Sequence, residues 1–166
     1  NLIRKEIFLS LKFFPDKTLR QICEPIKKID AEIHELSRKM LVLMKINNGI
    51  GLAAPQVGIT KRLFVCEIEN KPLILINPHI IQTSGESKMI EGCLSLPERN
   101  VNIKRSHKLL VKGFDSQGKE MQYEMAGLWA RVIQHEMDHL DGILICDYDK
   151  NMQKKIKKNM QDVMDL

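Results

Sequence analysis

The chain has 166 residues, of which 43% are hydrophobic and 28% are charged, and its formal net charge is +5. This length fits a single domain spanning 1–166 with a core of its own, and no stretch is apolar enough to span a bilayer. The four cysteines are widely spaced, without a C-x-x-C pair, which excludes a disulfide scaffold and favours a reducing compartment.

The first third of the chain predicts a turn and one long helix. Residues 1–14 contain an apolar run, but Lys12 interrupts it and no small-residue cleavage site follows, so a signal peptide is not predicted. Phe14-Pro15-Asp16 is typical of a turn that caps a short helical piece. Asp30 is a good N-cap for a helix from Ala31 to about Ile46. The predicted core face of this helix consists of Ile33, Leu36, Met40 and Leu43.

Small residues dominate the next segment, Gly49-Ile50-Gly51-Leu52-Ala53-Ala54-Pro55-Gln56. They let the backbone approach another segment or a ligand closely. The segment lacks the spacing and the lysine of a phosphate-binding loop. Gln56 is its one polar side chain, and the sequence leaves two alternatives about equally open: a functional amide or a solvent-facing residue of a tight turn.

Two hairpins are predicted in the middle of the chain. The first pairs residues 62–68 with 72–76, and the second pairs 108–114 with 119–125. In the last of these segments, Met121, Tyr123 and Met125 alternate with polar residues, as in a half-buried antiparallel strand. Three histidines outside any ligand pattern, His34, His79 and His107, are predicted to lie at the surface.

Cys93 lies between the hairpins, in the stretch Glu91-Gly92-Cys93-Leu94-Ser95-Leu96-Pro97. The preceding glycine permits a turn that points the sulfur inward. Most isolated cysteines are simply small buried hydrophobes, and this alternative stays open for Cys93 taken alone.

The stretch Gln134 to Gly142 contains an H-E-x-x-H pattern, His135-Glu136-Met137-Asp138-His139. Hydrophobic periodicity predicts a helix from Leu128 to about Asp141 with two buried faces and one polar face, the latter including Arg131. Two histidines four residues apart lie one turn apart on one side of a helix, where both reach the same metal ion. The alternative is a pair of core histidines bonded to the backbone.

A catalytic site of this kind needs a third protein ligand and one open position. The H-E-x-x-H-x-x-G-x-x-H pattern of zinc proteases is matched from His135 to Gly142, but Ile145 occupies the position of its last His. Neither His nor Glu follows His139. An upstream ligand is therefore favoured. Cys93 is a good candidate, because a thiolate with two imidazoles is a known catalytic ligand set.

The tail, about 147–166, predicts a basic amphipathic helix. Its apolar positions are Met152, Ile156, Met160 and Val163, and its lysines are Lys150, Lys154, Lys155, Lys157 and Lys158. The helix either packs on the body of the protein with its lysines in water or docks on a partner.

Three of these stretches, taken together and in this order, resemble the peptide deformylase family. Its marks are a G-x-G-x-A-A-x-Q loop, an E-G-C-x-S segment and a Q-H-E-x-D-H-x-x-G helix, and this chain matches all three. The resemblance covers about residues 13–147. It implies removal of the formyl group from the formyl-methionine of new polypeptides, in the cytoplasm. It also implies an α+β fold, with small antiparallel β-sheets around the central H-E-x-x-H helix and with N-terminal and C-terminal helices.

The resemblance further implies the roles of individual residues. The metal ligands fall on Cys93, His135 and His139, with water in the fourth position, and Fe(II) is the expected ion, with zinc, nickel and cobalt as alternatives. Glu136 carries a proton, and the Gln56 side chain and the Leu94 backbone N–H stabilise an oxyanion. The residues expected to bind the substrate are Ile50, Gly51, Gly92, Leu128 and Val132, with Arg131 bordering the pocket.

The expected partners are formyl-methionyl nascent peptides, with docking on the ribosome through the basic tail; neither a membrane nor sequence-specific nucleic acid is expected. Two functions of other classes remain as alternatives. One is a zinc peptidase that cuts internal bonds, and the other is a non-catalytic basic module with a structural metal. The missing downstream ligand argues against the first. The presence of only three good ligands argues against the second, because structural zinc normally has four.

Overall fold

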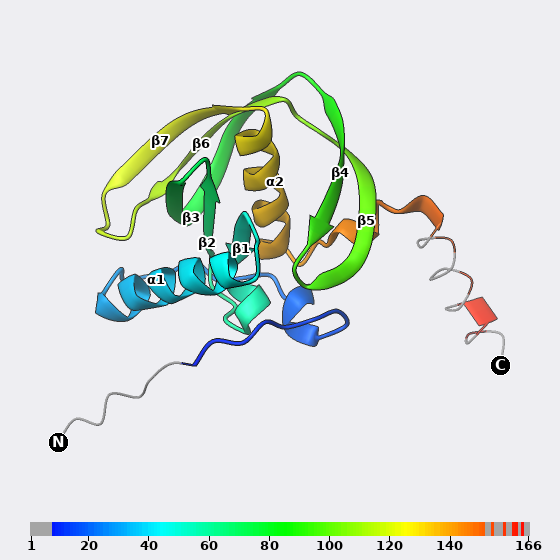
Figure 1. The fold of residues 1–166 in the computed structure, drawn as a ribbon, viewed down its shortest axis with the longest axis horizontal. Coiled ribbons are helices and arrows are strands. Elements are labelled where there is room, and N and C mark those ends of the chain that lie inside the picture. The colour runs from blue at the N-terminus through cyan, green and yellow to red at the C-terminus, as the bar shows by residue number, and fades with distance from the viewer. Residues whose placement is uncertain (1–7, 152–153, 155–157, 159–160, 163, 165–166) are drawn as a thin grey trace.

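The computed structural model describes residues 8–151, 154, 158, 161–162 and 164 (Figure 1). Between residues 8 and 149 the chain forms two α-helices, α1 (Ala31–Ile46) and α2 (Leu128–Leu140), and seven strands. The strands are β1 (Gly51–Ala53), β2 (Leu63–Ile68), β3 (Lys71–Ser84), β4 (Ser87–Cys93), β5 (Leu96–Arg105), β6 (Lys108–Phe114) and β7 (Glu120–Ala126). Three short 3₁₀ helices complete the set: η1 (Lys17–Arg20), η2 (Ala54–Val57) and η3 (Ile145–Tyr148).

The strands form two antiparallel sheets, with α2 between them (Figure 1). The larger sheet has the order β1-β2-β3-β6-β7, and the smaller one consists of β4 and β5. Helix α1 lies on the other side of the larger sheet. This arrangement confirms the predicted α+β class and the central position of the H-E-x-x-H helix.

Strand β2 shows why the larger sheet is buried on both faces. Phe64 and Cys66 pack in one cluster with α2, whereas Leu63 and Val65 pack in another cluster with α1. Successive side chains of a strand point to opposite faces, so a run of consecutive apolar residues serves two cores at once. The sheet therefore holds α2 rigidly from one side.

Helix α1 begins as the sequence predicts. The Asp30 side chain accepts a hydrogen bond from the Ile33 N–H at 3.1 Å, a cap that contributes about 1 kcal/mol. Leu36, Met40 and Met44 are buried against the sheet. Asp16 caps η1 in the same way through the Thr18 N–H, so the predicted short helical piece is confirmed too.

Helix α2 ends where the chain packs against the backbone of η1. Gly142 follows the helix with φ +72°, a conformation that favours glycine. A Cβ atom at this position would lie 2.6 Å from the Arg20 carbonyl oxygen. The glycine thus lets η1 pack directly against the end of the helix that carries the histidines.

The strands differ from the prediction in three places. The sequence predicted no strand at β1, because the small residues of this segment give no strand pattern. Strand β3 runs on from the predicted end at 76 to Ser84, through a register shift between Ile76 and His79 where Asn77 has φ +50°. The β4–β5 hairpin was not predicted, because its charged and exposed residues give no apolar alternation. The alternation in β7 is confirmed, and His34, His79 and His107 are exposed.

The predicted apolar face of the C-terminal helix, Met152, Ile156, Met160 and Val163, lies outside the described residues. Across the part of the chain that is described, none of the helices combines the length and the apolar character needed to cross a bilayer.

Candidate metal centre

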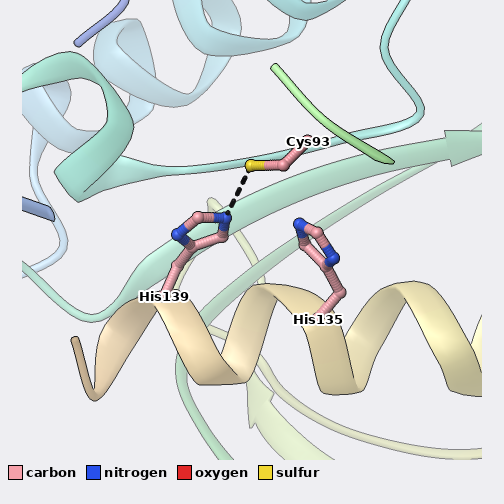
Figure 2. A group of neighbouring side chains, drawn as sticks. All are labelled: Cys93, His135 and His139. Atoms are coloured by element: carbon pink, nitrogen blue, oxygen red, sulfur yellow. Dashed lines mark hydrogen bonds between the residues drawn. The ribbon is translucent and has the colours of Figure 1, made fainter. Parts of the chain in front are cut away.

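Two elements bring three metal-ligating side chains together. His135 and His139 project from α2 toward Cys93, which ends β4 (Figure 2). The Cys93 Sγ lies 3.4 Å from the His139 Nε2, and one ligand atom from each of the three residues falls within 4.8 Å of the others. Sulfur and nitrogen ligands of one tetrahedral ion lie about 3.6 Å apart, given the usual bond lengths. The three side chains therefore fit a single metal ion.

Cys93 owes its position to the end of the β4–β5 hairpin. The strands shift register between Glu91 and Cys93, and Cys93 pairs with Leu96 across a two-residue turn. The bulge at Gly92 lets Cys93 close the hairpin while its sulfur faces the histidines. The inward turn predicted from this glycine is thus realised as a bulge and a tight turn together.

Glu136 lies between the histidines and is 2% exposed. Its Oε2 atom has no hydrogen-bond partner among the described residues, which is costly for a buried oxygen unless a water molecule or a substrate pairs with it. Burial raises the pKa of Glu136 to about 7, against the opposing effect of His135. A carboxyl group with such a pKa accepts and returns a proton near neutral pH.

Gly51 makes room for this carboxyl group. A Cβ atom at residue 51 would collide with the Glu136 Oε1. Gly49 is also in close contact, since a Cβ there would lie 2.6 Å from the Leu94 side chain. The predicted close approach of this glycine-rich segment is confirmed, and its neighbours are Glu136 and Leu94.

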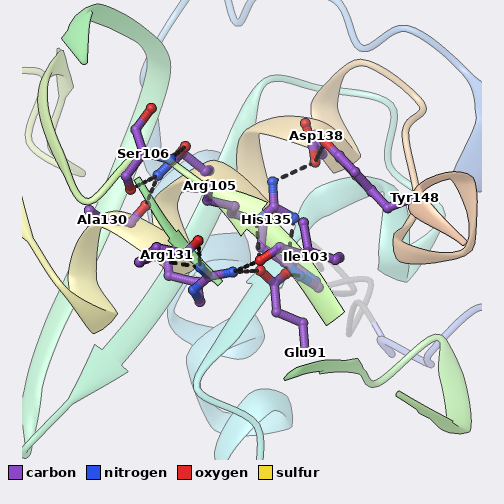
Figure 3. Close-up of polar contacts among 11 residues, drawn as sticks. Glu91, Ile103, Arg105, Ser106, Ala130, Arg131, His135, Asp138 and Tyr148 are labelled. Atoms are coloured by element: carbon purple, nitrogen blue, oxygen red, sulfur yellow. Dashed lines mark hydrogen bonds and ion pairs between the residues drawn. The ribbon is translucent and has the colours of Figure 1, made fainter. Parts of the chain in front are cut away.

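The buried carboxylate of Glu91 orients the His135 ring through its Nδ1 atom. The His135 Nδ1 lies 2.9 Å from the Glu91 Oε1 (Figure 3). A proton on Nδ1 leaves Nε2 free to face Cys93. Burial lowers the pKa of His135, but hydrogen bonds with Cys93 and Glu91 outweigh burial and raise the pKa to about 10. Metal binding at Nε2 requires loss of that proton.

Glu91 is itself held by two arginines. Arg105 binds it in a bidentate pair at 2.7 and 3.0 Å, and the Arg131 Nη1 lies 2.5 Å from its Oε2 (Figure 3). Burial raises the pKa of Glu91, but the hydrogen bonds from His135 and Arg105 outweigh it and lower the pKa to about 2. Arg105 also pairs with Asp138 on α2 at 2.9 Å. When His135 is neutral, the negative charges of Glu91 and Asp138 balance the positive charges of Arg105 and Arg131.

His139 sits deeper than its partner. It is 1% exposed, and its Nδ1 has no hydrogen-bond partner among the described residues. Burial lowers the pKa of His139 well below its ordinary value, with His135 adding to the effect. The neutral imidazole that results is the form that binds a metal.

Gln56 is buried rather than solvent-facing, with 1% of its surface exposed. Its Oε1 accepts a hydrogen bond from the Ala53 N–H at 2.9 Å. Its Nε2 donates to the Ser95 hydroxyl at 3.1 Å and lies 3.6 Å from the Cys93 sulfur. The alternative of a surface residue in a tight turn is therefore wrong.

A cavity of about 580 Å³ opens beside two of the three ligands, Cys93 and His135. Residues singled out from the sequence that line it are Ile50, Gly51, Gln56, Gly92, Cys93, Leu94, Leu128, Val132, His135 and Glu136. His139 is buried and is not part of the wall. Ile50 and Leu128 form a rim, with 46% and 42% of their surfaces exposed, whereas Val132 is buried.

The predicted polar face of α2 is wrong for two residues: Ala130, which falls on that face of the helical wheel, is fully buried in the core, and Arg131 is buried too. Arg131 borders the cavity as predicted, but it is 4% exposed and lies beneath the β4–β5 hairpin. Besides Glu91, it donates to the carbonyl oxygens of Ile103 and Ser87. The ion pairs of Glu91 were missed for the same reason: a charged residue that is buried with partners has the same sequence signature as a solvated one.

The sequence and the fold both match known proteins. The sequence profile of the polypeptide deformylase family matches residues 9–155. A peptide deformylase of Dictyoglomus thermophilum is 48% identical over 132 residues, or 80% of this chain and 86% of the relative. Another, of Thermodesulfovibrio yellowstonii, is 44% identical over 153 residues, or 89% of this chain and 93% of the relative.

Solved structures give the same result. A peptide deformylase from Synechococcus elongatus in complex with actinonin matches with a TM-score of 0.84 and 41% identity, over 89% of this chain and 82% of that one. The structure from Thermotoga maritima matches with a TM-score of 0.83 and 40% identity, over 85% and 97%.

Proposed function

This chain belongs to the peptide deformylase family, and from that premise we propose how its residues divide the chemistry of the reaction. The protein is a hydrolase that removes the formyl group from N-terminal formylmethionine. Water adds across the amide C–N bond, and the products are formate and a free amino terminus. One observation carries the assignment of roles: Glu136 places an unpaired buried oxygen beside the cluster of metal-ligating side chains.

Cys93, His135 and His139 hold one divalent ion, with Fe(II) favoured by the family resemblance and zinc, nickel and cobalt as alternatives. The spacing of the three ligand atoms supports this assignment, as does a donor set of one sulfur and two imidazoles. When bound, such an ion polarises a carbonyl group and makes water acidic enough to attack near neutral pH.

Glu136 moves the proton. Its free Oε2 accepts a proton from the attacking water and then delivers it to the nitrogen that leaves, so one carboxyl group serves first as base and then as acid. A pKa near 7 suits both steps.

The formyl oxygen gains negative charge during the attack, and two donors stabilise it. They are the Gln56 side-chain amide and the Leu94 backbone N–H, which both border the cavity. A donor of this kind contributes about 3 kcal/mol to the transition state. The Gly51 edge of β1 pairs with the peptide backbone as an added strand, with Ile50 and Gly92 beside it. The methionine side chain packs between Leu128 and Val132.

Formate release tests this function directly. We expect the metal-loaded protein to release one formate from each formyl-Met-Ala-Ser peptide, with no cleavage of internal bonds. The acetylated and the free-amine peptides are matched controls, and both should stay intact. Internal cleavage of the free-amine peptide without formate release would show that the protein is a peptidase instead.

The basic tail supports a further part of the proposal, docking on the ribosome in the cytoplasm, where formylated chains emerge. Its lysines lie close in the sequence, from Lys150 to Lys158. Removing residues after Asp149 should abolish co-sedimentation with ribosomes at low salt, because that attraction is electrostatic, and should leave turnover of short formyl peptides largely unchanged. Loss of short-peptide turnover, or a lower melting temperature, would show instead that the tail covers the core.

A further inference from the structure

One buried hydrogen bond joins the two segments that carry the oxyanion donors. Gln56 belongs to η2, and Ser95 follows Leu94 in the turn between β4 and β5. The Gln56 Nε2 donates to the Ser95 Oγ at 3.1 Å, and these side chains are 1% and 0% exposed. The bond therefore forms away from solvent, where it has no competition from water.

A second hydrogen bond fixes which end of the Gln56 amide points toward Ser95. The Ala53 N–H needs an acceptor and takes the Gln56 Oε1 at 2.9 Å, so the NH₂ group points the other way, toward Ser95 and Cys93. An amide nitrogen carries two hydrogens. Ser95 accepts one, and the second is directed at the Cys93 Sγ, which lies 3.6 Å from the Nε2.

The backbone near the N-terminus braces the same two residues. The Lys12 N–H donates to the Gln56 carbonyl oxygen at 2.7 Å, and the Phe14 N–H donates to the Ser95 carbonyl oxygen at 2.9 Å. One strap, residues 12–14, thus ties the η2 segment to the turn after Cys93. The η2 segment and this turn are far apart in the sequence, so hydrogen bonds rather than chain connectivity fix the distance between them.

We propose that Ser95 is a positioning residue: it holds the Gln56 amide so that the second N–H stays on the Cys93 side of the cavity, where it can turn from the sulfur to the oxyanion, next to the Leu94 N–H. This inference rests on the proposed function, because it gives Gln56 its purpose. Among the described residues, the Ser95 hydroxyl makes no hydrogen bond to a donor atom of the three metal ligands, so Ser95 acts through Gln56.

A double-mutant cycle in kcat tests the proposal. We expect Gln56→Ala to lower kcat by about 10²–10³-fold and Ser95→Ala by about tenfold, with little change in KM. In the Gln56→Ala background, Ser95→Ala should change kcat very little, because its effect passes through an amide that is no longer present. An equal loss in both backgrounds, or no loss in the native background, would overturn the proposal.

Two further readouts separate positioning from general damage. Metal content should stay at one ion in Ser95→Ala, and loss of the ion would show that Ser95 acts on Cys93 instead. Ser37→Ala is the matched control, because Ser37 is also 0% exposed and donates to the Ile33 carbonyl in α1, far from the cavity. It should lower the melting temperature without changing kcat. Ser95→Cys keeps the size with a weaker acceptor, and its kcat should fall between those of the native protein and Ser95→Ala. If Ser95→Ala does not fold, Ser95→Cys replaces it and should still show a lower kcat than the native protein.

Hydrogen exchange of the Gln56 side-chain amide gives an answer that does not depend on turnover. In ¹⁵N-labelled protein the two amide protons, identified by their absence in Gln56→Ala, should exchange about tenfold faster in Ser95→Ala than in the native chain. Unchanged exchange would overturn the proposal even if the enzyme is active. Absence of formate release by the native protein would overturn the proposed function. The exchange experiment would still test the effect of Ser95 on the Gln56 amide, because it does not depend on turnover.

Discussion

Replacing Glu136 by Gln should lower kcat for a formyl-Met peptide by about 10²–10⁴-fold, the range for loss of a general acid–base group. Glutamine fills the same space and keeps a polar end in the buried position, but it does not carry the proton from water to the leaving nitrogen. The metal should remain, because Glu136 is not among the three ligands. Steady-state kinetics and metal analysis on the same sample measure both effects.

Glu124→Gln is the control for this experiment. Glu124 lies exposed on β7, so its replacement removes one carboxylate from the protein without touching the cavity. Its kcat should equal that of the native protein. A Glu136→Gln protein that loses its metal would show that this carboxyl group is a ligand, and one that keeps full turnover would show that the proton travels by another route.

Replacing Cys93 by Ala should remove the metal and with it nearly all turnover. Of the three ligands that the described residues bring together, the thiolate is the one supplied from outside α2, and two imidazoles on one helix leave an ion without its third protein ligand. Loss of a ligand has a larger effect than loss of a residue that only hydrogen-bonds to a ligand, as Glu91 does to His135. Replacement of such a partner typically lowers metal affinity 10–100-fold. Metal stoichiometry after dialysis, together with formate release, measures the outcome.

Cys66→Ala is the matched control among the cysteines. Cys66 is fully buried between β2 and α2, and burial raises the pKa of its thiol, so it is an inert core residue. This substitution should reduce stability while metal content and turnover persist. If instead Cys93→Ala binds one ion and stays active, the ligand set is different and the assignment of the site is wrong.

The sequence predicted the features of this protein that depend on local pattern. The period of apolar residues placed α2 at 128 to about 141, within one residue of its observed end at Leu140. The H-E-x-x-H spacing then determined which side chains share one side of that helix. Cys93 followed from ligand chemistry, since two imidazoles need a further donor and nothing suitable lies downstream.

Features that depend on distant partners were not predictable in this way. Arg131 has the sequence context of a surface residue, and only the β4–β5 hairpin folded over it supplies Glu91 as its partner. Gln56 was left undecided for a similar reason: its burial depends on Ser95, which is 39 residues further along the chain. Periodicity measures apolar burial, and a buried charge or amide satisfied by a remote partner has no such signature.

Gly51 has a consequence for the evolution of inhibitor resistance. Proteins escape a compound that competes for a cavity by adding bulk where the compound enters. At residue 51 this route has a functional cost, since the first added carbon would displace the carboxyl group of Glu136, which carries the proton. Rim residues such as Ile50 and Leu128 are less constrained, because their exposed side chains can change size without displacing that group. A compound that makes its contacts with the backbone at Gly51, and few with the rim, leaves the enzyme the fewest viable substitutions.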